Sequence, residues 1–328
     1  MLRKSLLGVI LAAATATPLA AQTVMLKLNS PAPPRSYLHA GVFEPWAKEV
    51  EADSEGTLKI QLHYGGTLGH FGVNYDRVVD GVADIGFILS AITGGKFKQQ
   101  DVAALPFETR DANESAQALW NIYQKGVTAS EFGPVRPLGI WTFPNSAIHA
   151  KEPIRSMDDL KGKKIVASNL IAARIATALG ATPVTLRPDE VYQAISRGTA
   201  EASLMPFTGM LTFKVNEVAK HHLNAALGSD AAMLIINKKA YDSLPAKAKA
   251  SIDKHSGLAL SKRLGAATQA EWERALNIVK DSTTTLSADQ EGQWKAALTP
   301  ISEEWARTAP DGAKVLAGFR AEVGAMRK

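Results

Sequence analysis

Short apolar runs alternate with longer amphipathic runs from Val24 onward, and this alternation limits the folds open to the chain. The short runs are typical of strands, and the longer ones carry apolar residues at helical spacing, as Val42, Trp46 and Val50 do. The pattern predicts an α/β protein rather than an all-β or all-helical one. We expect strands at residues 24–29, 58–63, 84–89, 137–142, 164–168, 182–186, 202–206 and 232–237, and helices at 40–52, 113–123, 170–179 and 189–196.

The texture of the sequence changes after Pro245. Residues 246–280 form a stretch of 35 residues without proline, interrupted only by Gly257 and Gly265. An unbroken helix of this length would measure about 50 Å, more than the diameter of one small domain. We therefore expect a long helix that spans two lobes, followed by helices at about 288–305 and 312–326.

The length and the lack of a linker favour two lobes that share one chain path. The 328 residues, 46% of them hydrophobic, suffice for one large domain or two ordinary ones. No internal repeat and no low-complexity linker divides them. Two lobes without a flexible linker predict that the chain crosses between them more than once, with a cleft where they meet.

The first residues have the pattern of a secretory signal. Arg3 and Lys4 precede an apolar stretch at residues 6–14, and small residues stand before Gln22. The apolar stretch is too short for a membrane span, which needs about 20 residues. We expect residues 1–21 to be a signal peptide and the protein to work in the periplasm, not embedded in the membrane. Cysteine is absent, which excludes disulfides, thiolate nucleophiles and a lipid anchor on cysteine.

Charge and motifs argue against nucleic acid and against most enzyme classes. Lys plus Arg number 37 against 32 Asp plus Glu, and removal of Arg3 and Lys4 leaves 35 − 32 = +3. No basic run is present, so we expect no nucleic-acid partner. No GxSxG, GxxxxGK[ST], GxGxxG, HExxH or EF-hand motif occurs. The adjacent His221 and His222 point in different directions and make a poor chelating pair. We expect a binding protein without metal or cofactor, and not an enzyme.

The order and spacing of several short segments carry more information than any one of them. The segments are residues 46–50, 56–60, 65–69, 81–86, 105–108, 157–165, 179–183, 190–195 and 244–245. In this arrangement the chain resembles the extracytoplasmic solute-binding proteins of tripartite ATP-independent periplasmic (TRAP) transporters, the DctP family. The likeness extends along nearly all of the expected mature length.

The resemblance implies a fold and a role. It implies a two-lobed α/β binding protein whose lobes close on a small solute, with a long helix across both. Such proteins deliver their solute to TRAP membrane permease subunits, which use an ion gradient, and most known ligands are organic acids. We expect residues 22–145 and about 232–262 in one lobe, and residues 146–231 and about 263–328 in the other.

The sequence departs from the family where a carboxylate is usually bound. In most members the strand after the Leu-Lys-Gly segment ends in Lys-Ile-Arg, and that arginine binds the ligand carboxylate with two hydrogen bonds. Here Val166 takes its place, and valine donates no hydrogen bond. A second family position, often polar and just before a proline, corresponds to Met205. We expect Phe207 and Trp141 to lie near these two positions. The pocket should therefore be less polar than a site for a dicarboxylate or a sugar acid.

Three kinds of ligand remain open on these grounds. An organic acid would be held by Asn169 and the free N–H groups at the start of the helix from Leu170, with Arg174 or Arg35 adding charge. A neutral, aromatic solute would be held by apolar surface. A cation would lie over an aromatic face such as that of Trp141.

The expected ligand-binding residues also have ordinary structural interpretations. Large aromatic residues are often plain core, and asparagines often cap helices or form turns. Ser90 is included because strand ends in open α/β sheets face the ligand crevice. The expected set is Phe71, Ser90, Trp141, Asn145, Val166, Asn169, Arg174, Met205 and Phe207.

Overall fold

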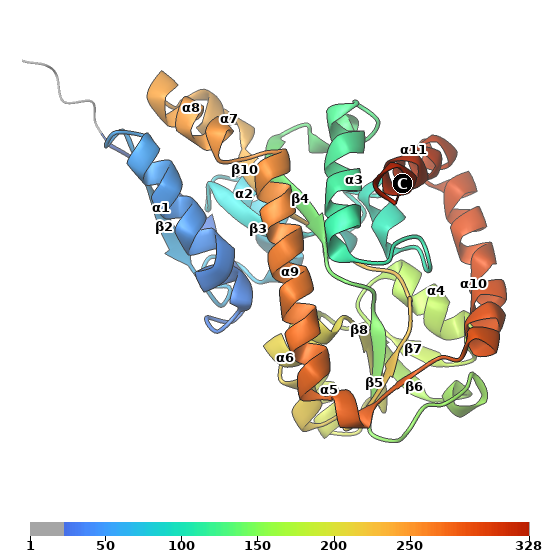
Figure 1. The fold of residues 1–328 in the computed structure, drawn as a ribbon. Helices are drawn as coiled ribbons and strands as arrows, with labels where there is room; N and C mark the ends of the chain where they lie inside the picture. Colours follow the sequence, from blue (N-terminus) through green and yellow to red (C-terminus); the bar gives the residue numbers. More distant parts are fainter. Residues whose placement is uncertain (1–22, 328) are drawn as a thin grey trace, which may run out of the picture.

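The computed structural model describes residues 23–327, which form two β-sheets flanked by helices (Figure 1). The expected signal peptide, residues 1–21, lies outside these described residues. The α/β class predicted from the sequence is confirmed, and each sheet forms the centre of one lobe. The strands of the first sheet, in spatial order, are β2 (Leu58–His63), β1 (Val24–Asn29), β3 (Ile85–Leu89), β10 (Ala231–Asn237) and β4 (Val135–Thr142).

The first sheet is completed by a strand from the second half of the chain. β1 runs parallel to β2 and β3, whereas β10 pairs antiparallel with both β3 and β4. β10 is buried along its whole length because it lies between two neighbours in the sheet. The chain therefore leaves the first lobe after β4 and returns to it at β10, as the missing linker predicted.

The second sheet contains six strands, several of them short. In spatial order they are β11 (Thr283–Thr285), β9 (His221–Asn224), β5 (Ala147–Ala150), β8 (Ala202–Met205), β6 (Lys164–Ala167) and β7 (Thr182–Val184). β5, β9 and β11 were not predicted. They have three or four residues, and β9 and β11 are polar, so their pairing comes from neighbours distant in sequence rather than from a local apolar pattern.

Helices cover both sheets. α3 (Ala112–Gln124) begins at Asp111, whose carboxylate accepts from the N–H groups of Asn113 and Glu114. α4 (Leu170–Ala178) begins at Asn169, whose side chain accepts from Ala172 N. The remaining helices of these regions are α1 (Glu44–Asp53), α2 (Asn74–Val79), α5 (Val191–Ser196), α6 (Phe207–Thr212) and α7 (Lys238–Asp242).

The long helix expected over residues 246–280 is broken. α8 (Ala246–Lys254) and α9 (Leu258–Ile278) meet at Gly257, whose φ of 79° does not fit a helix. Gly265 stays helical within α9, where a Cβ would lie 3.0 Å from Ala112 O, so its lack of a side chain lets α9 approach α3. α9 is about 31 Å long and still passes both lobes, packing on α3 and β4 of the first and α6 of the second (Figure 1).

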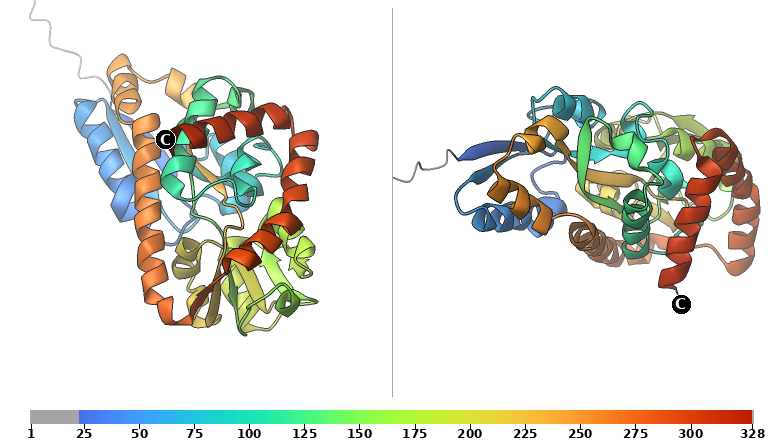
Figure 2. Two further views of the ribbon diagram at one scale, coloured as in Figure 1. Left: turned by 45° about the vertical axis from the view of Figure 1, so that its right-hand side comes forward. Right: turned by 90° about the horizontal axis from the view of Figure 1, so that it is seen from above.

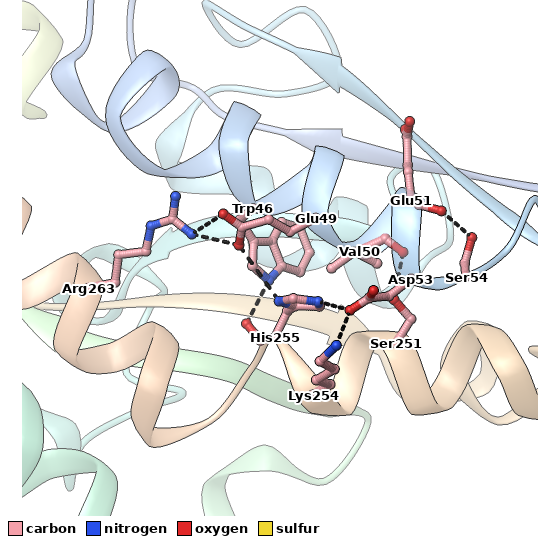
Figure 3. A network of polar contacts seen from close by, with 10 residues as sticks. All are labelled: Trp46, Glu49, Val50, Glu51, Asp53, Ser54, Ser251, Lys254, His255 and Arg263. Carbon is pink, nitrogen blue, oxygen red and sulfur yellow. Dashed lines mark hydrogen bonds and ion pairs between the residues drawn. The ribbon is translucent and has the colours of Figure 1, made fainter.

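The break between α8 and α9 is held against α1 by polar contacts (Figure 3). Trp46 Nε1 donates to His255 O at 2.9 Å, and Arg263 Nη1 donates to both carboxylate oxygens of Glu49 at 3.0 and 2.8 Å. Lys254 pairs with Asp53 at 2.6 Å. These contacts fix the direction in which α9 starts.

The last two helices lie beside different lobes (Figures 1 and 2). α10 (Ala288–Thr308) packs on α4, whereas α11 (Gly312–Met326) packs on α3. Ion pairs join Lys125 to Glu322 and Arg320 to Glu108, the latter at 2.6 Å. The expected lobe boundaries stay a prediction. For α11 these contacts favour the first lobe rather than the second.

Candidate functional site

A cavity of about 60 Å³ lies between the two lobes. Tyr37, Phe71 and Phe87 line it from the first lobe, and Met205 and Phe213 line it from the second. A single buried water needs about 10–15 Å³ of such space, so the cavity has room for about four to six waters. That volume suits a small solute with one ring.

Aromatic rings form the walls of the cavity. Phe71 meets Phe87 edge to face, with ring centroids 5.7 Å apart, and it meets Phe213 of the other lobe at 6.5 Å. Trp141 lies behind this layer and stacks on Phe87 at 5.4 Å. The lobes thus contact each other through aromatic side chains, and a ligand ring would replace water against apolar surface.

The charged end of the cavity is a carboxylate at the crossing between lobes. Asp230 lines the cavity directly before β10, and Asn169 Nδ2 donates to its Oδ1 at 2.6 Å. Asn169 Oδ1 accepts from Ala172 N at 2.7 Å, so both ends of this amide are occupied. Burial raises the pKa of Asp230 to about 6, although the hydrogen bond from Asn169 opposes the rise. Asp230 is therefore largely ionised at pH 7 and above.

Two more acidic groups lie behind Asp230. Asp101 is near enough to Asp230 and Glu131 for both to raise its pKa, after the larger effect of burial. Burial also raises the pKa of Glu131 to about 7, although N–H groups of Gln99 and Gln100 bind its carboxylate. Both raised pKa values favour the neutral, protonated carboxyl groups, so this side of the cavity disfavours further negative charge.

Two hydroxyl groups add hydrogen-bonding capacity to the cavity. Tyr37 Oη donates to Thr268 Oγ1 at 3.2 Å, and burial raises the pKa of Tyr37 above its usual range. Thr208 is fully buried and lines the cavity close to Tyr37, yet its Oγ1 has no hydrogen bond of good geometry within residues 23–327. An unsatisfied buried hydroxyl is costly, so a ligand or water is its natural partner.

No arginine, lysine or histidine lines this cavity within the described residues. Arg35 lies at its edge, where Nη2 donates to Thr212 O at 2.7 Å. Arg187 is bound to Asp189 at 3.1 Å and to Glu190 at 3.3 Å. Nothing in the lining replaces the arginine that is missing at Val166.

Of the nine residues predicted from the sequence, Phe71 and Met205 line the cavity, and Asn169 contacts it through Asp230. Val166 is 1% exposed and belongs to the same buried cluster as Met205 and Phe207. Trp141 and Phe207 are fully buried outside the lining, and Ser90 donates to Ala231 O at 3.1 Å.

The other two predicted residues lie away from the cavity. Arg174 forms an ion pair with Glu304 of α10 at 3.2 Å. Asn145 lines a different groove and donates to Thr109 O at 2.9 Å. Neither Arg174 nor Asn145 lines the interlobe cavity, and Arg174 is paired with Glu304 instead.

Sequence reasoning missed Asp230, Tyr37 and Thr208. Asp230 stands directly before a fully buried strand, and a charge at that boundary was the available signal. Tyr37 and Thr208 follow prolines in irregular or short helical segments and carry no comparable signal. Within residues 23–327, no three His, Asp or Glu side chains are grouped so that they could hold a metal ion.

A comparison with protein families shows to which family the chain belongs. The family described as "Bacterial extracellular solute-binding protein, family 7" (DctP) matches residues 28–308. The chain belongs to this family. Its members are TRAP solute-binding receptors, a class of transport protein and not of enzyme, that work with a membrane permease.

Named relatives and solved structures support the same family. This family 7 protein is 31% identical to the C4-dicarboxylate-binding periplasmic protein DctP of Rhodobacter capsulatus over 208 residues, which are 62% of this chain and 59% of that one. A marine metagenome TRAP solute-binding protein specific for aromatic acids, solved with 3-hydroxybenzoate, has a TM-score of 0.88 at 28% identity over 93% of this chain and 99% of that one. A Rhodoferax ferrireducens TRAP protein with copurified benzoate has a TM-score of 0.87 at 26% identity, over 92% and 98%.

None of the helices found in residues 23–327 combines the length and apolarity that crossing a membrane requires. The fold is shared with the solved relatives at the TM-scores given above.

Proposed function

We propose that this protein is the periplasmic receptor of a TRAP transporter for a small solute with one aromatic ring. The observation that carries the proposal is the interlobe cavity of about 60 Å³ whose walls are Phe71, Phe87 and Phe213. Two solved relatives bind single-ring aromatic acids. Their ligands support the ring as the shared feature, because the aromatic walls provide apolar contact whatever substituent the ring carries.

The aromatic walls do not determine which polar group the solute carries. An aromatic acid follows from the relatives and from the habit of the family, whereas a neutral or cationic solute follows from Val166. An acid would need donors, and Asn169 already uses its amide on Ala172 N and Asp230 while Arg174 is paired with Glu304. Arg35 at the cavity edge is the remaining guanidinium among those considered.

We also propose that the protein is exported to the periplasm. Arg3, Lys4 and the apolar residues 6–14 support cleavage near Gln22. Mass spectrometry of the protein isolated from a periplasmic extract would show a mature chain that begins near residue 22. An intact N-terminus on a cytoplasmic protein would contradict this part.

A thermal-shift screen tests the receptor role. Ligand that binds only the folded state adds about 2.7 kcal/mol of stability at a hundredfold excess over Kd. We expect single-ring aromatic solutes to raise Tm, and non-aromatic keto acids and sugars to raise it little. A Tm that responds to C4-dicarboxylates and not to any aromatic solute would contradict the proposal.

A further inference from the structure

We propose, on the basis of the aromatic-solute function above, that this receptor selects ring compounds that carry a protonated amine, and that Asp230 binds the ammonium group. Such a ligand would carry a positive charge, whereas most known ligands of the family are organic acids. It rests on the position of one carboxylate in the cavity, the charges around it, and an unused hydroxyl.

Asp230 has an oxygen available for a ligand. Asn169 Nδ2 binds Oδ1 at 2.6 Å, and within residues 23–327 the structure shows no hydrogen bond to Oδ2. The amide of Asn169 is itself held by Ala172 N, so the carboxylate has a fixed support at the start of α4. A carboxylate accepts up to about four hydrogen bonds, and a primary ammonium has three to donate.

The charges around the cavity favour a cation over an anion. Asp230 is the one Asp or Glu in the described lining, which has no Arg, Lys or His, and Asp101 adds a second acidic group behind it. A buried carboxylate without a counter-ion is unfavourable, and a ligand ammonium would supply that counter-ion. A ligand carboxylate in the same place would meet like charge and no paired donor.

Other parts of the lining fit the same ligand. The rings of Phe71, Phe87 and Phe213 offer apolar walls, and an aromatic face also attracts a cation within about 6 Å. Thr208 Oγ1 is buried close to Tyr37 and makes no hydrogen bond of good geometry within the described residues, so it can accept an N–H or bind a ring hydroxyl. The cavity therefore has a second polar group besides Asp230 for a small aromatic amine.

The decisive experiment uses three probes of nearly equal size and different charge. Benzylamine is a cation at pH 7.5, benzyl alcohol is neutral and benzoate is an anion. Isothermal titration of the mature protein should give the tightest Kd for benzylamine, at least about tenfold below that of benzoate, because a desolvated charge pair is worth more than a neutral contact. Benzyl alcohol should fall between them.

Asp230→Asn supplies the second arm. The substitution keeps the shape and the bond from Asn169, so benzylamine should weaken at least about tenfold while benzyl alcohol still binds and reports an intact cavity. Asp158→Asn is the matched control, because Asp158 is an exposed acid paired with Lys161 and lies outside the cavity lining. It should leave all three affinities unchanged.

The outcomes separate this inference from the proposed function. Tightest binding of benzoate, or equal loss of benzylamine in the two variants, would overturn the inference and leave the aromatic receptor intact. No binding of any probe to the wild type at 10 mM, a concentration of the order that detects millimolar Kd values, would overturn both.

Discussion

Asp230 is the residue whose charge state should influence stability as well as ligand choice. Its pKa rises from 3.8 in the unfolded chain to about 6 in the folded protein. The folded state therefore binds the proton more strongly, so this contribution is fully present below pH 4 and is lost as the pH rises through 6. Ionised Asp230 should cost the unliganded protein of the order of 1 to 3 kcal/mol at pH 8.

Asp230→Asn tests this cost directly. The variant should be more stable than the wild type at pH 8, and the difference should shrink toward zero at pH 4. Urea unfolding at both pH values, monitored by circular dichroism without ligand, measures it. A difference independent of pH would show that the carboxylate is not desolvated. Because Asp230 also raises the pKa of Asp101, the measured difference includes the relief of that interaction.

Single residues show why a site is predicted less completely than a fold. Met205 could be predicted because the resemblance to the family implies a ligand position just before Pro206, whereas Phe71 lies outside the matching segments. Val166 marked the missing clamp, but its burial against Met205 and Phe207 depends on how the second lobe packs. Asp230 lines the cavity only because β10 returns to the first sheet and places the preceding residue between the lobes.

The junction between α8 and α9 is the element whose geometry most depends on one glycine. Gly257 has φ 79° and ψ −144°, a region that residues with a Cβ rarely enter, and its N–H binds Leu138 O at 2.6 Å. A Cβ there would also lie 3.3 Å from the ring of Trp120. Gly257→Ala should destabilise the protein by about 1–3 kcal/mol.

Gly292→Ala is the matched control for this prediction. Gly292 is exposed within α10, and a Cβ there meets no atom within 4 Å. Alanine should stabilise this helix by roughly 0.5–1 kcal/mol, since glycine loses more backbone freedom on folding. Differential scanning calorimetry should thus show a lower Tm for Gly257→Ala and a higher Tm for Gly292→Ala than for the wild type. A lower Tm in both variants would argue that the loss of stability in Gly257→Ala does not come from the backbone conformation of Gly257.

At the level of elements, the sequence predicts what has a local pattern. Eight strands were placed within two residues of their observed bounds, because each has an apolar run of its own. β9 and β11 have the sequences HHLN and TTT, and only pairing with each other and with β5 makes them strands. The break at Gly257 was a visible interruption, yet deciding between a kink and a stop needed the packing of α8 on α1.

The whole molecule consists of two lobes that are joined without a flexible linker. The crossing after β4, the return at β10 and the passage of α9 join them, while the cavity lies between them. In the structure the lobes also touch through Phe71 and Phe213, and through the bond from Arg35 to Thr212 O. We expect these contacts to be lost when the cleft opens, so they should influence the balance between open and closed forms.

Arg35→Ala should shift that balance toward the open form. Loss of this one solvent-exposed hydrogen bond costs of the order of 0.5–1.5 kcal/mol, which corresponds to a change of about two- to tenfold in the ratio of closed to open molecules. Small-angle X-ray scattering of the unliganded protein should then give a larger radius of gyration than for the wild type. Arg197→Ala removes an equal charge from an exposed position of the second lobe, where no ion pair is formed within the described residues, and should leave the radius unchanged. Equal radii for the Arg35 variant and the wild type would mean that the aromatic contact alone holds the lobes together, because the guanidinium would then contribute nothing to closure.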